Sequence, residues 1–240
     1  MQAVILAGGK GTRLRPFTTT LPKPILPVGD EPVVAIVLSQ LREAGVTKVT
    51  MAVNHMAELI MSFFGTGHKF GLCVEYSVED RPLGTVGPVK RIPNLPEHFL
   101  VMNGDILTDL DFCALFRSHI SGNAKLTVAT YQREVPIDFG VLELNKAGSL
   151  KGFQEKPTFK FDVSMGVYMF SRSILEDVPD DEPYGFDQLV LSMLERGDAI
   201  NSFRHSGYWL DLGRPDDYDR ANQEIETLPI FKKGRRRATA

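Results

Sequence analysis

The residues best suited to chemistry begin with a glycine-rich turn near the N-terminus. Gly8, Gly9 and Gly11 follow an apolar segment that ends at Leu6. Without Cβ atoms, such a turn lets backbone N–H groups approach a phosphate or a flat base, and Arg13 adds a cation there. The spacing fits neither the P-loop nor the G-x-G-x-x-G dinucleotide pattern. A plain tight turn is the alternative.

Lys23 strengthens the phosphate interpretation. It stands between Pro22 and Pro24, and these prolines leave its backbone little freedom. Its ammonium group can therefore be aimed as a point charge. Together with Arg13, it indicates a triphosphate ligand.

Two acids follow other apolar runs. Asp105 ends residues 101–105, and Asp211 ends the aromatic and apolar run 208–211. Mg²⁺ usually binds one or two carboxylates together with substrate phosphates, so the pair predicts a shared magnesium ion. The alternative for each acid is a helix or turn cap.

A fourth place has an acid and a base before a proline. Glu155 and Lys156 precede Pro157 at the end of a strand-like run. Lys156 could reach a phosphate and Glu155 could accept sugar hydroxyls. An ordinary exposed Glu–Lys pair is the alternative.

The elements that must position these residues alternate along the first half of the chain. Apolar runs predict buried strands over residues 2–6, 48–53, 72–76 and 99–102. Amphipathic spacing predicts helices over residues 33–44, 55–64 and 111–119. This alternation predicts a parallel sheet with helices on both faces, with ligands bound at the carboxyl ends of its strands.

The second half is richer in strands. They are expected over residues 126–131, 140–144, 150–155 and 166–170, followed by helices over 187–196 and 218–226. No internal repeat is found. We therefore predict one domain over residues 1–226, an open sheet with a β-rich insertion. The last segment, 227–240, carries five cations and is expected to be a flexible basic tail.

Composition sets the remaining limits. The 240 residues are 43% hydrophobic and 24% charged, as in an ordinary soluble domain, with a net charge of −3 that gives no general attraction for nucleic acid. No apolar run approaches the roughly 20 residues that span a bilayer. Cys73 and Cys113 are widely separated in apolar surroundings and are expected to be core thiols. We expect a cytoplasmic protein that binds neither nucleic acid nor membrane.

Taken together, these motifs resemble the sugar-1-phosphate nucleotidylyltransferases, also called NDP-sugar pyrophosphorylases. The family's Gly-Gly-x-Gly-Thr-Arg-Leu and Pro-Lys-Pro stand at residues 8–14 and 22–24. Its Asn-Gly-Asp, Glu-Lys-Pro and Trp-x-Asp-x-Gly follow in the family's order at 103–105, 155–157 and 209–213. The resemblance implies a GT-A-like fold: a Rossmann-like, mostly parallel α/β sheet with an inserted β-rich sugar-binding portion.

The resemblance also implies roles for residues. Arg13 and Lys23 would hold the triphosphate and stabilise the transition state with Asp105, while Asp105 and Asp211 would bind Mg²⁺. Lys156 would bind the sugar phosphate. Further nucleotide-binding residues would be Leu6, Ala7, Gly8, Gly9, Gly11, Thr12, Glu79, Gly84 and Thr85. Further residues on the sugar-phosphate side would be Gly140, Glu155 and Ser164.

The expected reaction transfers a nucleoside monophosphate from a nucleoside triphosphate to a sugar 1-phosphate and releases pyrophosphate. It needs no general base, since a phosphate monoester is already a nucleophile at neutral pH. Glu79 or Asp80, in the family's base-reading loop, could accept the N–H donors of guanine. This indicates GTP with a mannose- or heptose-type sugar, as in the short mannose-1-phosphate and heptose-1-phosphate guanylyltransferases, which would act as a monomer or homodimer. Two alternatives remain: a glucose-1-phosphate thymidylyl- or uridylyltransferase, and an inactive regulatory subunit that binds nucleotide-sugar.

Overall fold

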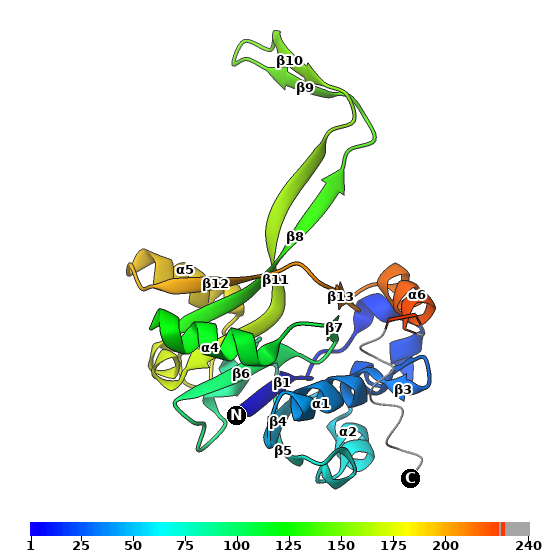
Figure 1. Ribbon diagram of the computed structural model, residues 1–240, viewed down its shortest axis with the longest axis vertical. Helices are drawn as coiled ribbons and strands as arrows, with labels where there is room; N and C mark the ends of the chain where they lie inside the picture. Colours follow the sequence, from blue (N-terminus) through cyan, green and yellow to red (C-terminus); the bar gives the residue numbers. More distant parts are fainter. Residues whose placement is uncertain (226, 229–240) are drawn as a thin grey trace.

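A seven-stranded sheet runs through the computed structural model, which describes residues 1–225, 227 and 228 (Figure 1). The strand order is β12-β8-β11-β6-β1-β4-β5. The strands are β1 (Gln2–Leu6), β4 (Lys48–Val53), β5 (Cys73–Val78), β6 (His98–Asn103), β8 (Leu126–Pro136), β11 (Thr158–Ser171) and β12 (Ile200–His205). All neighbours pair in parallel except β11, which is antiparallel to both β6 and β8.

Helices cover both faces of this sheet and enclose two cores. Along β1, Ala3 and Ile5 point into one core and Val4 into the other, because successive side chains of a strand point to opposite faces. The first core receives α1 (Val33–Glu43), α2 (Ala57–Phe64), α4 (Phe112–Gly122) and α6 (Pro215–Glu224). The second receives α3 (Gly87–Lys90) and α5 (Phe186–Glu195). The predicted mostly parallel α/β class is thus confirmed.

Element boundaries differ from the predictions where a local signal is weak. Helix α6 begins at Pro215 rather than at 218, because proline suits the first turn of a helix. Helix α4 begins at Phe112, one residue later than predicted, because Asp111 is its N-cap and accepts the Ala114 N–H through its side chain. Strand β12 was not predicted, because this edge strand is only half-buried and has no apolar run.

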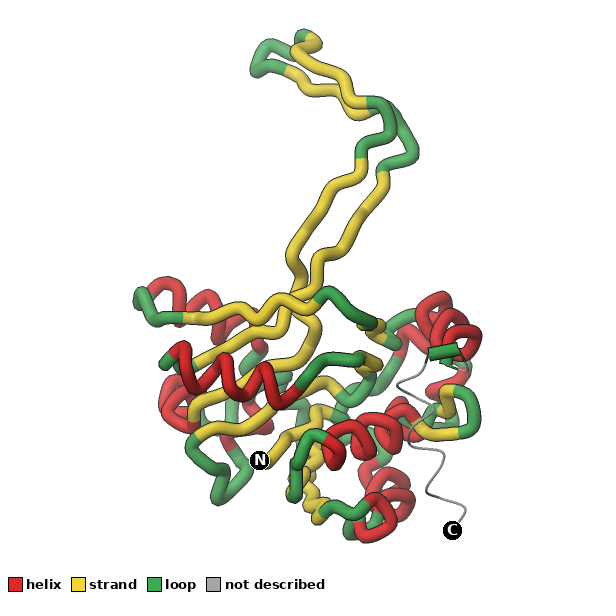
Figure 2. The backbone as a smooth tube through the Cα atoms, viewed as in Figure 1, coloured by secondary structure: helices red, strands yellow, loops and turns green. Residues whose placement is uncertain are grey.

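Two strands of the β-rich insertion, β8 and β11, are longer than predicted. Strands β8 and β11 continue past the edge of the body as a paired ribbon, and β9 (Val141–Leu144) and β10 (Leu150–Gln154) form a hairpin at its far end (Figure 2). We call residues 132–163 the arm. The predicted strands 126–131 and 166–170 were too short, because the arm's strands are exposed and show no pattern of burial.

Three other expectations concern the surface and the ends of the chain. Cys73 is exposed and Cys113 is half-buried, so the prediction that both are core thiols was wrong. None of the helices in the described part of the chain is long and apolar enough to cross a membrane. The expected basic tail falls mostly on residues 229–240, outside the described residues.

Candidate active site

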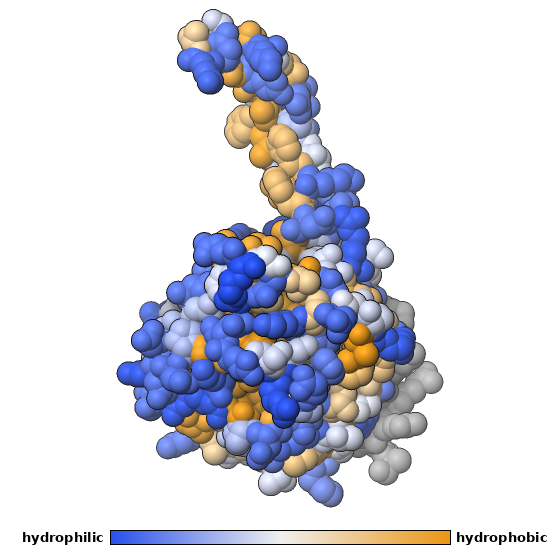
Figure 3. Space-filling model, turned by 90° about the vertical axis from the view of Figure 1, so that its left-hand side faces the viewer, coloured by the Kyte–Doolittle hydropathy of each residue, from blue (hydrophilic) through white to orange (hydrophobic). Residues whose placement is uncertain are grey.

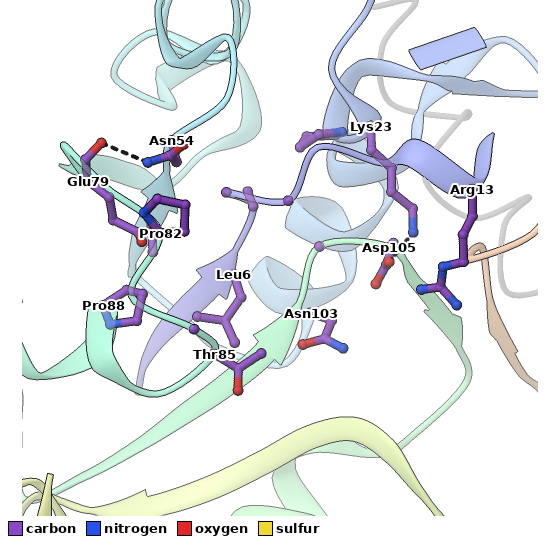
Figure 4. Close-up of a pocket in the computed structure, with 17 residues that line it drawn as sticks. Leu6, Arg13, Lys23, Asn54, Glu79, Pro82, Thr85, Pro88, Asn103 and Asp105 are labelled. Atoms are coloured by element: carbon purple, nitrogen blue, oxygen red, sulfur yellow. Dashed lines mark hydrogen bonds and ion pairs between the residues drawn. The ribbon is translucent and has the colours of Figure 1, made fainter. Parts of the chain in front are cut away.

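A pocket of about 380 Å³ opens at the carboxyl ends of β1, β4 and β6 (Figure 4). Its position agrees with the rule that open parallel sheets bind ligands at this edge. The lining residues are Leu6, Ala7, Gly8, Gly9, Arg13, Lys23, Pro24, Ala52, Asn54, Glu79, Pro82, Gly84, Thr85, Pro88, Asn103, Gly104 and Asp105.

The glycine turn forms one wall of this pocket. A Cβ atom on Gly8 would lie 2.9 Å from Glu79 Oε1, so glycine allows the turn and the opposite loop to approach closely. Gly11 has a φ of +61°, and its carbonyl accepts a hydrogen bond from the Thr18 hydroxyl at 2.7 Å. Gly11 and Thr12, which were predicted to bind the nucleotide, are not among the pocket's lining residues.

The two predicted cations reach one end of the pocket from short helical turns. Arg13 lies in the 3₁₀ helix η1 (Thr12–Leu14), and Lys23 begins η3 (Lys23–Ile25) with extended Pro22 before it. The Lys23 side chain is only 14% exposed, and its Nζ contacts Asp105 Oδ2. In Figure 4, Arg13, Lys23 and Asp105 point toward one another.

A small second sheet brings the two predicted acids together. Strands β7 (Ile106–Thr108) and β13 (Trp209–Asp211) pair antiparallel, with Asp211 opposite Ile106. The Leu212 N–H also donates to the Asp105 carbonyl at 3.0 Å. The two acids therefore lie side by side, although they are far apart in the sequence.

The electrostatics of this pair suit a cation. Burial raises the pKa of Asp211, and the nearby Asp105 carboxylate raises it further, against the opposing effect of Lys23 and Arg13. In the described part of the chain, the buried Oδ1 atoms of Asp105 and Asp211 have no hydrogen-bond partner. Two unpartnered carboxylate oxygens in one place are a donor set that a hard divalent cation would satisfy.

Gly213 explains the last position of the Trp-x-Asp-x-Gly motif. A Cβ atom there would lie 2.9 Å from Asp211 Oδ1 and 3.3 Å from Arg13 Nη2. Any larger residue would press on both groups. Glycine at this position lets the guanidinium and the carboxylate share the same end of the pocket.

The predicted base-reading loop forms the opposite wall. Glu79 is buried; its Oε2 accepts the Leu83 N–H at 3.1 Å, and its carbonyl accepts from Asn54 Nδ2 at 3.0 Å. Burial raises the pKa of Glu79. Gly84 has a φ of +80°, and a Cβ atom there would lie 2.6 Å from the Tyr184 carbonyl oxygen. The Thr85 hydroxyl accepts the Phe186 N–H at 2.7 Å, so the loop is held on both sides.

Sequence reasoning did not assign several residues of the pocket. Asn54 directly follows strand β4, and Asn103 is the last residue of strand β6. Both line the pocket. Their position was a usable signal, since polar residues at the carboxyl ends of parallel strands lie where ligands bind. Pro24, Pro82 and Pro88 add apolar surface to the walls of the pocket, and sequence reasoning did not assign any of the three to the site.

None of the four predicted sugar-side residues lines this pocket. Gly140, Glu155 and Lys156 are exposed in the outer part of the arm. Ser164 lies at the arm's root, where its hydroxyl donates to Tyr168 Oη at 3.2 Å. Beside the root is a hollow of about 480 Å³, lined by Tyr131, Gln132, Arg133, Glu134, Trp209, Leu210, Asp211, Asp217 and Arg220. Asp211 thus lines this hollow and also lies beside Asp105.

The fold and the pocket define an α/β protein in which cations and acids meet beside a glycine turn at the carboxyl edge of a mostly parallel sheet. The chain belongs to the Nucleotidyl transferase family, whose model matches residues 2–227.

Curated relatives include enzymes for different nucleotides. The chain is 34% identical to a mannose-1-phosphate guanyltransferase of Yarrowia lipolytica, over 91% of this chain and 62% of the relative. It is 32% identical to a UTP–glucose-1-phosphate uridylyltransferase of Synechocystis, over 96% of this chain and 66% of the relative. The chain therefore spans about two thirds of the length of these relatives.

Solved structures match over nearly their whole length. HddC from Yersinia pseudotuberculosis is 25% identical, with a TM-score of 0.73 over 93% of this chain and 99% of that one. HddC complexed with GMP-PN is 26% identical with a TM-score of 0.72. A putative glucose-1-phosphate thymidylyltransferase from Bacillus anthracis, 24% identical with a TM-score of 0.75, shares the fold.

Proposed function

We propose that this protein transfers a nucleoside monophosphate from a nucleoside triphosphate to a sugar 1-phosphate and releases pyrophosphate. The observation that carries this proposal is the meeting of Arg13, Lys23 and Asp105, which line the pocket, with the neighbouring Asp211. Phosphoryl transfer depends on positioning and on neutralising charge, and this cluster can supply both. The names of the relatives support the same reaction class.

The residues of the cluster divide the work by charge. An oxygen of the sugar phosphate attacks the α-phosphorus in line as pyrophosphate leaves, and negative charge spreads over the phosphoryl oxygens. Arg13 can bind two of these oxygens with its planar guanidinium, while Lys23 acts as a point charge held by its prolines. No side chain has to remove a proton, because the attacking phosphate is already ionised at neutral pH.

Asp105 and Asp211 are the residues that would hold Mg²⁺. Their unpartnered buried oxygens fit a divalent cation. A bound cation would neutralise the polyphosphate and lower the cost of bringing both carboxylates together. Lys23 contacts Asp105 through Oδ2 and leaves Oδ1 available, so one carboxylate can serve both the lysine and a metal.

For the base and sugar, we propose GTP with a mannose- or heptose-type sugar 1-phosphate. The Glu79 carboxylate lies in the pocket wall opposite the glycine turn, where its oxygens can accept the adjacent N–H donors of guanine. The similarity to HddC complexed with GMP-PN supports this choice. The uridylyltransferase relative keeps a glucose-1-phosphate uridylyl- or thymidylyltransferase as the second candidate.

A panel assay tests these proposals. Pyrophosphate release is measured with Mg²⁺ for GTP, UTP and dTTP, each combined with mannose, glucose and heptose 1-phosphates. We expect turnover with GTP and a mannose- or heptose-type sugar. Turnover with UTP or dTTP and glucose 1-phosphate alone would replace the proposed specificity. A folded protein that is inert with every pair would favour the inactive regulatory subunit.

A further inference from the structure

The arm separates the sugar-side residues from the pocket of their own chain. Its two strands pair without interruption from Ser164 opposite Thr130 to Thr158 opposite Pro136. At about 3.3 Å per residue, this ribbon is about 20 Å long. Lys156 lies two residues beyond its outer end, whereas Ser164 pairs with Thr130 at its inner end. The paired ribbon of β8 and β11 projects from the body in Figure 1.

The root of the arm lies close to the acids and is braced there. The Trp209 Nε1–H donates to the Met165 carbonyl at 3.0 Å, and the Trp209 ring lies 5.2 Å from that of Tyr131. Arg204 Nη2, on strand β12, contacts both carboxylate oxygens of Asp162, at 2.6 and 2.8 Å. Folding the arm back over its own pocket would break these contacts and bend the paired ribbon.

The surface of the arm is unusually apolar for an exposed segment. Large apolar side chains follow it from root to tip, visible as an orange band along the projection in Figure 3. They are Val135, Phe139, Leu142, Leu144, Leu150, Phe153, Phe159 and Phe161, with Phe139 77% exposed. Each of these side chains exposes on the order of 100 Å². Their summed exposed area approaches the roughly 800 Å² that each partner buries in a standard protein–protein interface.

The charge of the arm favours a protein partner over an anionic surface. Residues 132–163 contain five basic and five acidic side chains, so the arm has no net charge. A membrane headgroup or nucleic-acid backbone would be met by an excess of lysine and arginine. A projection with balanced charges and a large exposed apolar surface is instead suited to pack against another folded chain.

We propose that two copies of this chain pair by exchanging arms, so that the arm of one copy brings Glu155 and Lys156 to the hollow beside Asp211 of the other. This inference rests on the proposed function and on the expectation, from the family resemblance, that Lys156 binds the sugar phosphate. The hollow is polar and open next to Asp211. The base of the arm lines it through Gln132, Arg133 and Glu134, and the paired ribbon then leads away from it toward Glu155 and Lys156. A twofold arrangement makes the exchange mutual, so both sites are completed.

Mixed dimers test the exchange directly. Arg13→Ala carries its defect in the body, and Lys156→Ala carries its defect in the arm. Each variant alone is expected to be inactive. When the two are co-expressed with different tags, half of the dimers are mixed, and each mixed dimer has one site with an intact body and an intact arm. We therefore expect the unfractionated mixture to regain about one quarter of the wild-type activity.

The controls separate the possible failures. Co-expression of Arg13→Ala with Asp105→Asn, both defects of the body, should regain nothing. No recovery with the Lys156→Ala pair would overturn the exchange in favour of an arm that serves its own chain, and so would full activity of Lys156→Ala alone. An inactive wild-type protein would instead count against the proposed function.

The oligomeric state is an independent test, because it needs no activity. In analytical ultracentrifugation, the wild-type protein should sediment as a dimer at micromolar concentration. Leu150→Asp, in the arm, should sediment as a monomer. Leu191→Asp, on helix α5 of the body, should remain a dimer, although Leu150 and Leu191 are equally exposed at 61% and 60%. A monomeric wild-type protein, or two variants that behave alike, would contradict the proposal.

Discussion

At the scale of single residues, the two oxygens of the Asp105 carboxylate have different surroundings. One oxygen contacts Lys23, and the other is buried without a partner among the described residues. Asp211, held beside it by strands β7 and β13, has a pKa raised by burial and by this neighbouring charge. Two acids so placed are costly without a cation, which is why their arrangement indicates a role in binding rather than in stability.

Asp105→Asn should therefore reduce turnover far more than stability. An amide keeps the size of the side chain but loses the charge that a metal ion and Lys23 require, so we expect kcat to fall about 100-fold or more. The melting temperature should change little, since removing one of two like charges relieves repulsion. Asp180→Asn, an exposed acid paired with Lys90, is the matched control and should keep full activity. Normal turnover by Asp105→Asn would remove this acid from the site.

Glu79→Gln tests how the base is read. Glutamine can still accept the Leu83 N–H, but it replaces one acceptor with a donor that opposes the N–H groups of guanine. We expect the preference for GTP over UTP, measured as the ratio of kcat/KM values, to fall by about tenfold. Asp80→Asn is the control, because Asp80 is exposed and pairs with Arg91 outside the pocket. An unchanged preference would mean that backbone groups select the base.

At the scale of elements, a buried polar cluster joins helix α4 to the sheet. His119 Nδ1 lies 2.8 Å from Thr127 Oγ1 on β8, and Nε2 lies 3.2 Å from both Ser171 Oγ on β11 and His98 Nδ1 on β6. Burial lowers the pKa of His119 to about 4, and His98 acts in the same direction. The cluster therefore holds its central imidazole neutral.

This cluster predicts a pH dependence of folding. Because the pKa of His119 is lower in the folded than in the unfolded chain, the unfolded chain binds more protons below about pH 6.5. Stability should thus fall as the pH drops from 6.5 toward 4, with about 2 kcal/mol of the free energy of unfolding lost between pH 7 and pH 5. Urea unfolding at these two pH values measures the loss. It should disappear in His119→Gln and persist in His68→Gln, an exposed control; equal losses in both variants would assign it to other groups.

Element by element, the sequence was most informative where burial is periodic. Every strand and helix predicted in the first half lies within a few residues of an observed one, because each buries one face or both against the cores. The short α3 and β7 of this half were not predicted. Strand β12 and the outer parts of β8 and β11 were missed. These segments are partly or wholly exposed, so their hydrogen-bonded ladder has no counterpart in a pattern of apolar residues.

At the scale of the whole molecule, the body and the arm divide the proposed substrates. Every residue around the main pocket comes from the body, whereas Gly140, Glu155 and Lys156 come from the arm. Deleting the outer part of the arm should therefore impair the use of the sugar phosphate while leaving nucleotide binding intact.

Replacing residues 137–157 with a two-residue Asn-Gly turn should show this separation. The turn joins Pro136 to Thr158, which are already paired across the ribbon, so the body should fold normally. We expect the Kd for GTP, measured by calorimetry, to change by less than about threefold, while pyrophosphate release falls about 100-fold or more because the sugar phosphate is no longer positioned. Normal turnover by the shortened chain would show that the arm takes no part in the reaction.

The sequence alone determined the alternation of buried strands and helices in the first half, the glycine turn and the types of charged residue placed after the strands. These features are local: a buried strand, a proline-flanked lysine or a turn glycine is defined by a few neighbouring residues. Only the tertiary structure decided that Asp211 lies beside Asp105, that Asn54 and Asn103 face the same pocket, and that the arm points away from the body. Each of these depends on pairing between distant segments, where strands as short as three residues carry too little pattern to reveal their partner.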